Sequence, residues 1–254
     1  MTKIMDNGKV LSQDRLSKDI YSIRIKTDMA KDARAGQFVN VYTSNPSKLL
    51  PRPISICEIG GDSIRLVYRV TGEDTGTKEF SGLKAGDDIK LLGTLGNGFP
   101  IDSKSTILIG GGIGIPPMLE TAKQIEGERI IVLGFRDSDT FLVDEIESYG
   151  KVYIATEDGS IGTKGNVLDA IRENNISAKR ILACGPTPML RAIKKYAVEN
   201  NIECFLSLEE KMACGIGACL ACTCKSSKVD SHSKVKNKRI CSEGPVFNAL
   251  EVEL

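Results

Sequence analysis

The sequence predicts a chain of three parts: an antiparallel β-barrel over residues 1–100, a doubly wound parallel-sheet α/β domain over residues 101–208, and a small module over residues 209–254. The first hundred residues alternate apolar and polar side chains between turns, with no helix-like stretch among them. The next hundred contain four continuous apolar runs, each followed by a helix-like stretch, as in buried parallel strands. The remainder is rich in cysteine, glycine and lysine and follows neither pattern.

The composition is that of an ordinary globular protein. Of 254 residues, 41% are hydrophobic and 26% charged, which excludes a disordered chain, a coiled coil and a collagen-like repeat. Lys and Arg exceed Asp and Glu by one charge, so we expect no nucleic-acid or membrane partner. No apolar run reaches about 18 residues and the first residues lack the apolar stretch of a secretion signal. We therefore expect a cytoplasmic protein.

The barrel strands are predicted from period-two alternation. The pattern is clear over residues 21–26 and 64–70, and weaker over residues 38–42. Strands of this kind without intervening helices indicate an antiparallel barrel or sandwich.

The parallel strands are predicted at residues 107–109, 130–133, 152–155 and 181–183. After the fourth run, residues 187–200 form an amphipathic pattern with Ile193 and Ala197 on one face, as expected of a helix that packs on a sheet. In such a domain, ligands bind at the carboxyl ends of the strands.

Four of the eight cysteines fall within one stretch of 11 residues. Cys214, Cys219 and Cys222 have the spacing C-x4-C-x2-C, and with the distant Cys241 they match the ligand pattern of a [2Fe-2S] cluster. The alternatives are a structural zinc ion or unliganded thiols. Zinc usually takes paired C-x2-C units, and Cys241 has no such partner. We interpret Cys224 as a bystander.

A glycine-rich turn, Gly110–Met118, follows the first apolar run and opens a helix. Glycines at such a turn allow backbone N–H groups to approach a pyrophosphate, although a plain tight turn is the alternative. The turn departs from G-x-G-x-x-G, so the standard dinucleotide fold is not implied. The candidate nucleotide-binding residues here are Gly111, Gly112, Gly114, Ile115 and Pro116.

The fourth apolar run ends in Cys184-Gly185-Pro186. Its place at a carboxyl strand end puts Cys184 at the crevice where a nicotinamide could lie, which makes it the candidate catalytic residue, with Gly185 and Pro186 as cofactor contacts. A core cysteine is the alternative. No histidine lies within forty residues, and the only one in the chain is His232.

Two segments of the barrel half carry an arginine beside hydroxyl groups. One is Arg52-Pro53-Ile54-Ser55, and the other is Arg69-Val70-Thr71 together with Gly76 and Thr77. Such groups could bind a phosphate or the edge of a flavin, although solvated strand ends are an alternative reading.

In this order, the motifs resemble those of the ferredoxin reductase family of flavoproteins. With Glu209–Cys219 and Cys241–Phe247 added, nearly the whole chain is similar to the electron-transfer subunits of type B dihydroorotate dehydrogenase. The resemblance implies that the arginine and hydroxyl segments hold FAD. It also implies that the stretches around Gly112 and Cys184 face the nicotinamide of NAD, and that Cys214, Cys219, Cys222 and Cys241 hold the cluster.

The resemblance also implies a function. Electrons would pass from the FMN of a catalytic subunit through the [2Fe-2S] cluster and FAD to NAD⁺, in pyrimidine (UMP) biosynthesis, within a heterotetramer of two plus two subunits. The chain carries no candidate base for dihydroorotate, so it should not oxidise that substrate alone. The alternatives are the flavin subunit of a sulfide dehydrogenase or of a transhydrogenase that reduces ferredoxin, and a zinc-bearing binding module.

Three smaller features complete the expectations. Asp137 and Asp139 beside Arg136 favour NAD over NADP, because they would repel a 2′-phosphate. The lysine-rich segment 225–239 is either a solvated insertion or a docking surface beside the cluster. Two stretches depart from the family pattern by their length: residues 72–77, and the 18 residues between Cys222 and Cys241.

Overall fold

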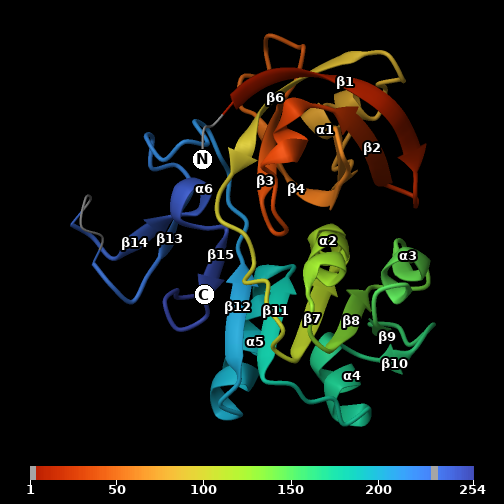
Figure 1. The fold of residues 1–254 in the computed structure, drawn as a ribbon, viewed down its shortest axis with the longest axis vertical. Coiled ribbons are helices and arrows are strands. Elements are labelled where there is room, and N and C mark those ends of the chain that lie inside the picture. The colour runs from red at the N-terminus through yellow and green to blue at the C-terminus, as the bar shows by residue number, and fades with distance from the viewer. Residues whose placement is uncertain (1–3, 230–233) are drawn as a thin grey trace.

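A computed structural model describes residues 4–229 and 234–254. Figure 1 shows a barrel above a helix-covered sheet, with the module of residues 209–254, called here the cysteine module, along one side of both. The predicted fold class is therefore confirmed.

Six antiparallel strands close the barrel in the order β1-β2-β5-β4-β3-β6. The alternation detected in the sequence corresponds to β2, β3 and β5. Ile23, Ile25, Ile64 and Leu66 point inward and are fully buried, because alternate side chains of a strand face the same side. The bounds are β1 Ile4–Arg15, β2 Ile20–Lys26, β3 Phe38–Tyr42, β4 Arg52–Ile59, β5 Ser63–Arg69 and β6 Asp88–Leu95, with η1 Asp28–Lys31 and α1 Gly76–Phe80 between them.

The α/β domain contains a sheet in the order β10-β9-β8-β7-β11-β12-β15. All four predicted apolar runs form parallel strands, and each is followed by a helix. The strands are β7 Thr106–Gly111, β8 Arg129–Phe135, β9 Lys151–Thr156, β10 Thr163–Lys164, β11 Arg180–Cys184 and β12 Glu203–Ser207. The helices are η2 Gly112–Gly114, α2 Pro116–Gln124, α3 Val143–Glu147, α4 Val167–Glu173 and α5 Thr187–Glu199. Within the described residues, no helix is both long and apolar enough to cross a membrane.

The order in which strands are added to the sheet switches sides at β7, which pairs with β8 on one side and with β11 on the other. Helices α4 and α5 pack on one face and α2 and α3 on the other, so the domain is doubly wound. The crevice between the carboxyl ends of β7 and β11 is the ligand position that this topology creates. Ile20, Cys57 and Val67 of the barrel pack with Met118 of α2, which seats the barrel over this crevice.

The cysteine module shares the core of the α/β domain. Strand β15 Val246–Asn248 pairs antiparallel with β12, and Met212, Ile240 and Phe247 lie in the same apolar cluster as Ile107. The module is therefore held to the sheet by a shared apolar core as well as by strand pairing. The remaining elements are β13 Thr223–Lys225, β14 Asn237–Arg239 and α6 Ile240–Glu243. The three domain boundaries stay a prediction.

Candidate redox site

The Arg-Pro-x-Ser segment lies on β4, in the barrel wall that faces the α/β domain. Ile54 points into the barrel, so Pro53 and Ser55 point to the outer face. The guanidinium of Arg52 covers Gly76, where a Cβ would stand only 2.3 Å from Arg52 Nε. Arg52 and Gly76, which are distant in sequence, therefore meet at one place.

The second arginine segment adjoins the first because β4 pairs with β5. Arg69 Nε lies 3.2 Å from Asp19 Oδ2, and the Val70 N–H donates to the Asp19 carbonyl oxygen. The Thr71 N–H donates to Thr77 Oγ1 over 3.5 Å, which ties this segment to α1.

The positive charge at this site is available to a ligand. Among the described residues, no carboxylate forms an ion pair with Arg52, whereas Arg69 is partly neutralised by Asp19. The Arg52 guanidinium donates to the Leu50 carbonyl oxygen but has no carboxylate partner among the described residues, so its charge suits an anionic group such as a phosphate. The residues therefore fit the flavin dinucleotide that the sequence implies.

The two turns of the nicotinamide side pack backbone against backbone. Cys184 and Gly110 are register partners on β11 and β7. A Cβ on Gly114 would stand 2.4 Å from the carbonyl carbon and oxygen of Cys184, and one on Gly111 would stand 2.5 Å from Met189 Sδ. Gly112 has a φ of +52° and open space beside it. This leaves a cradle for a ligand that approaches the backbone closely.

Other predicted residues of this side contribute through the backbone. Ile115 and Pro116 are buried at the start of α2, and Ile115 belongs to the core. Their side chains fix the turn, while Gly185 and Pro186 line its partner turn at the end of β11.

Cys184 lies at the crevice as a buried thiol. It is 1% exposed and packs in the apolar cluster that contains Leu108 and Met118. Burial, and then the charge of Glu209, raise its pKa far above the ordinary range, although a hydrogen bond with Ser207 opposes them. A thiol of this kind is protonated at neutral pH, so it can shape the nicotinamide pocket and cannot act as a nucleophile there.

The loop of residues 208–222, called here the cysteine loop, directs backbone N–H donors at the sulfur of Cys214. The N–H groups of Ile216 and Cys219 each lie 3.4 Å from Cys214 Sγ. Burial alone would raise the pKa of the Cys214 thiol, but these hydrogen bonds outweigh it and lower the pKa to about 7. Gly215 and Gly217 adopt positive φ angles of +69° and +86°, which lets the loop curl around the thiol.

Cys222 and Cys241 form the second pair of thiols. Both are buried, and the Cys241 N–H lies 3.4 Å from Cys222 Sγ. A hydrogen bond from the Cys241 thiol and this N–H lower the pKa of Cys222 to about 6, despite burial. The proton stays on Cys241, whose pKa is raised accordingly.

The donors fit a two-iron centre better than a single ion. The thiols come as Cys214 with Cys219 and Cys222 with Cys241. In the part of the chain that the structure describes, no three Cys, His, Asp or Glu side chains converge on one ion position. A structural zinc ion needs about four ligands around one point, whereas each iron of a [2Fe-2S] cluster takes two thiolates.

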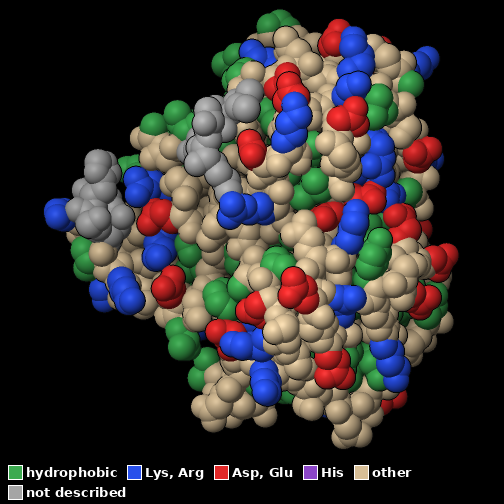
Figure 2. Space-filling model, viewed as in Figure 1, with side chains coloured by type: hydrophobic (Ala, Val, Ile, Leu, Met, Phe, Trp, Pro, Cys, Tyr) green, Lys and Arg blue, Asp and Glu red, His purple; other side chains and the backbone are tan. Residues whose placement is uncertain are grey.

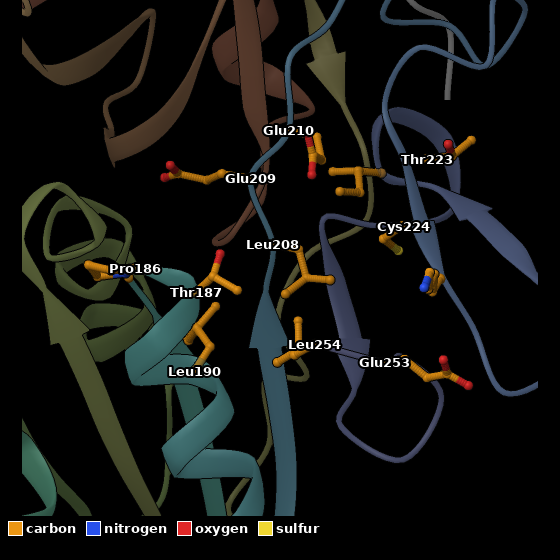
Figure 3. Close-up of a pocket in the computed structure, with 13 residues that line it drawn as sticks. Pro186, Thr187, Leu190, Leu208, Glu209, Glu210, Thr223, Cys224, Glu253 and Leu254 are labelled. Carbon is orange, nitrogen blue, oxygen red and sulfur yellow. The ribbon is translucent and has the colours of Figure 1, made fainter.

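Cys224 lies on β13, and burial raises its pKa to about 11. Together with Leu208 and Leu254, it lines a cavity of about 450 Å³ between the sheet and the cysteine module (Figure 3). Its surroundings therefore favour the bystander interpretation.

Two site residues escaped the sequence analysis. Glu209 follows β12 at the same sheet edge as Cys184, and Figure 3 shows it on the side of Pro186, away from Cys224. Although Glu209 is exposed to solvent as a residue, the protein atoms packed around its carboxyl group raise the pKa of that group. The other residue is Asn40, fully buried in β3 beside Gly215. The sequence feature that could have revealed Asn40 is a single polar residue in the middle of the apolar strand 38–42.

The lysine-rich segment 225–239 begins at the last residue of β13 and ends with β14, but residues 230–233, including His232, lie outside the described residues. Lys234 and Lys236 are exposed, while Lys238 pairs with Glu251 at 3.3 Å. Figure 2 shows Lys and Arg side chains interspersed with acidic ones over this region. Both interpretations of the segment stay open.

The residues predicted to select NAD lie after β8. Arg136 and Asp137 are exposed, whereas Asp139 accepts a hydrogen bond from Ser17 Oγ at 2.8 Å and so ties the domain to the barrel. Asp137 in turn accepts the Asp139 N–H at 2.8 Å, so both carboxylates are held beside Arg136, where they would disfavour a 2′-phosphate.

Comparisons with known proteins place these sites in a family. The model of the iron–sulfur cluster binding domain of dihydroorotate dehydrogenase B matches residues 209–253, and that of the oxidoreductase NAD-binding domain matches residues 108–195. The dihydroorotate dehydrogenase B (NAD(+)) electron transfer subunit of Fusobacterium nucleatum subsp. nucleatum is 41% identical over 256 residues, covering 94% of this chain and 95% of its own. The subunit of the same name from Geobacillus sp. (strain WCH70) is 43% identical, covering 96% and 97%.

Solved structures agree with this result. A chain of the NADH-dependent reduced ferredoxin-NADP oxidoreductase, studied for flavin-based electron bifurcation, superimposes with a TM-score of 0.86 at 29% identity, covering 98% of this chain and 90% of that chain. The Amycolatopsis cytochrome P450 reductase has a TM-score of 0.66 at 20% identity, covering 79% and 67%, and shows the shared fold. The predicted oxidoreductase class and cofactor set of FAD, a [2Fe-2S] cluster and NAD are confirmed. This chain belongs to the family of electron transfer subunits of dihydroorotate dehydrogenase B (NAD(+)).

Proposed function

We propose that this chain carries electrons between an FMN-containing dihydroorotate dehydrogenase subunit and NAD⁺, in the pyrimidine-forming pathway of the cytoplasm. One observation carries the proposal: the same β3–β4 wall of the barrel meets the nicotinamide crevice through α2 and the cysteine loop through Gly215. When bound, FAD would exchange hydride with the nicotinamide and single electrons with the cluster. A flavin that passes electrons between the two sites would have to lie beside both of them, and this wall of the barrel borders both.

At the nicotinamide end, the residues of the chain bind and orient. The backbone of Gly112 accepts a close approach, and the contact between Gly114 and Cys184 fixes the floor of the crevice. Because Cys184 is a neutral thiol, it packs without adding charge beside a positively charged nicotinamide ring. Glu209 and Asp137 supply the acidic groups near this edge.

At the other end, the chain holds thiolates ready for iron. The lowered pKa values of Cys214 and Cys222 mean that these thiols give up protons near neutral pH, as metal binding requires. Cys219 is exposed, so the cluster would lie close to the surface. A surface position suits single-electron exchange with a partner subunit.

The partner must supply the substrate chemistry. We propose that the FMN-bearing partner binds dihydroorotate and removes the proton from it. We further propose a heterotetramer of two catalytic and two electron-transfer subunits, with neither nucleic acid nor membrane as a partner.

Reconstitution tests the proposal. The purified chain is mixed with the catalytic subunit from the same genome, and NAD⁺ reduction by dihydroorotate is followed. We expect NADH from the mixture and none from either protein alone. Orotate formation by the isolated chain, or a mixture that forms no NADH although the chain is loaded with iron and flavin, would contradict the proposal.

A second function has its own support. The chain with a TM-score of 0.86 comes from a complex that uses ferredoxin and NADP. If this chain served such a complex, the loaded protein would oxidise reduced ferredoxin with NADP⁺ and would ignore the dihydroorotate dehydrogenase subunit. The exposed Asp137 disfavours this outcome because it would repel a 2′-phosphate.

A further inference from the structure

Asn40 is a buried amide whose hydrogen bonds are not made within the described chain. It lies in the middle of β3 and is 0% exposed, and neither Nδ2 nor Oδ1 has a partner there. A buried polar group without a partner costs about 1–3 kcal/mol, so native proteins almost always satisfy such groups. An apolar residue at this position would avoid that cost.

The side chain of Asn40 points out of the barrel and toward the cysteine loop. Val39 and Val41, its neighbours on the strand, point into the barrel core. The cross-strand partner of Asn40 is Pro53 on β4, so the two residues share the outer face of the wall. Asn40 therefore lies on the strand beside the proposed flavin segment.

The other side of Asn40 is the cysteine loop itself. A Cβ on Gly215 would stand 2.4 Å from Asn40 Nδ2 and 3.1 Å from Leu95 Cδ1. Gly215 directly follows Cys214, whose Sγ already accepts two backbone N–H groups. The amide thus lies against a loop whose other donors are aimed at sulfur.

We propose that Asn40 is a positioning residue whose side-chain amide donates a hydrogen bond to a sulfur atom of the iron–sulfur centre, from the barrel wall that also carries the flavin segment. This inference rests on the proposed function, because it requires the cluster to be bound. A donor at sulfur stabilises the added negative charge of the reduced cluster and so raises its reduction potential. It also links the cluster loop to the flavin strand by a direct contact.

The test uses the loaded protein and the variants Asn40→Leu and Asn40→Ala. The first replaces the amide with an apolar group of similar size, and the second removes it without adding bulk. The matched control is Asn97→Ala. Asn97 Nδ2 donates to the carbonyl oxygens of Glu243 and Val246, and its Oδ1 accepts from the Val246 N–H, so its partners are all in the protein.

Two readouts are independent of turnover: the reduction potential of the cluster from an EPR-monitored redox titration, and the side-chain amide nitrogen coupling to the reduced cluster in pulsed EPR. We expect both Asn40 variants to shift the potential to more negative values and to lose that coupling. Asn97→Ala should lower the midpoint temperature of unfolding, and should leave the reduction potential of the cluster and the nitrogen coupling unchanged.

An unchanged reduction potential in both Asn40 variants overturns the inference. Loss of iron from both variants, when Asn97→Ala keeps its iron, also overturns it, because Asn40 would then serve only to retain the cluster. A failure of the proposed function looks different. In that case the unaltered chain would itself lack the EPR signal of a reduced [2Fe-2S] cluster.

Discussion

The nicotinamide crevice and the cysteine loop are built in opposite ways. The crevice is formed by turns at the ends of β7 and β11, where Gly114 packs directly on the Cys184 carbonyl group. The cysteine loop, residues 208–222, contains no helix or strand, and its thiols are approached by backbone N–H groups at 3.4 Å. The sheet forms the crevice without any bound ligand, whereas the loop depends on its bound cluster to hold its structure.

Cys222→Ser should have the largest effect, because it removes a buried thiol that we propose as a ligand of the cluster. We expect iron content to fall to background and electron transfer to the partner subunit to fall at least about 100-fold, while FAD stays bound and is still bleached by NADH. Iron analysis and absorption spectra provide the measurement. Cys224→Ser is the matched control and should retain iron, since Cys224 lies on β13 beside a separate cavity.

Gly114→Ala tests the side that is completed by packing. The new Cβ would stand 2.4 Å from backbone atoms that cannot move aside, so we expect a loss of about 1–3 kcal/mol in the free energy of unfolding and a higher KM for NADH. Gly112→Ala meets no atom within 4 Å but must adopt a φ of +52°. It should lose only about 1 kcal/mol, the cost of the left-handed conformation. Equal losses in the two variants, measured by denaturant unfolding, would contradict the steric account.

The thiols outside the loop predict a pH dependence. Burial raises the pKa of Cys57, Cys184 and Cys204, the last to about 12, whereas an unfolded cysteine has a pKa of about 8.5. The stability that these protonated thiols contribute is fully present below about pH 8.5. It is lost as the pH rises toward their pKa values in the folded protein. Each thiol should therefore lower the free energy of unfolding by about 1.4 kcal/mol per pH unit in that window.

Cys204→Ala isolates one of these thiols. The slope of unfolding free energy against pH between about pH 9 and 10 should become shallower by about 1.4 kcal/mol per unit, the contribution of one proton. A slope that does not change would show that Cys204 ionises in the folded protein.

Regular patterns made much of the fold predictable. The alternation at residues 21–26 and the apolar runs such as 130–133 reflect burial on one or both faces of a sheet, which the sequence records directly. Strand β12, Glu203–Ser207, was missed because its five residues mix polar and apolar types. Strand β15 was missed because its pairing with β12 joins segments that only the tertiary structure brings together.

Spacing is what supports the prediction that the four cysteines hold the cluster, and that prediction still awaits a test. The contact between Arg52 and Gly76 depends instead on how strand β4 and helix α1 meet. Asn40 carries no motif at all, and its interest arises only from burial without a partner. Non-local packing of this kind leaves little trace in a single sequence.

Anaerobic titration of the purified chain with NADH tests the central claim most directly, which is that one chain joins a nicotinamide site to an iron–sulfur centre through a flavin. The account predicts about two irons and one FAD per chain, bleaching of the flavin bands and the EPR signal of a reduced [2Fe-2S] cluster. It also predicts an end point of about 1.5 NADH per chain, because FAD takes two electrons and the cluster one. Bound zinc without flavin, or a flavin that NADH reduces while the cluster stays oxidised even with excess NADH and a redox mediator, would contradict it.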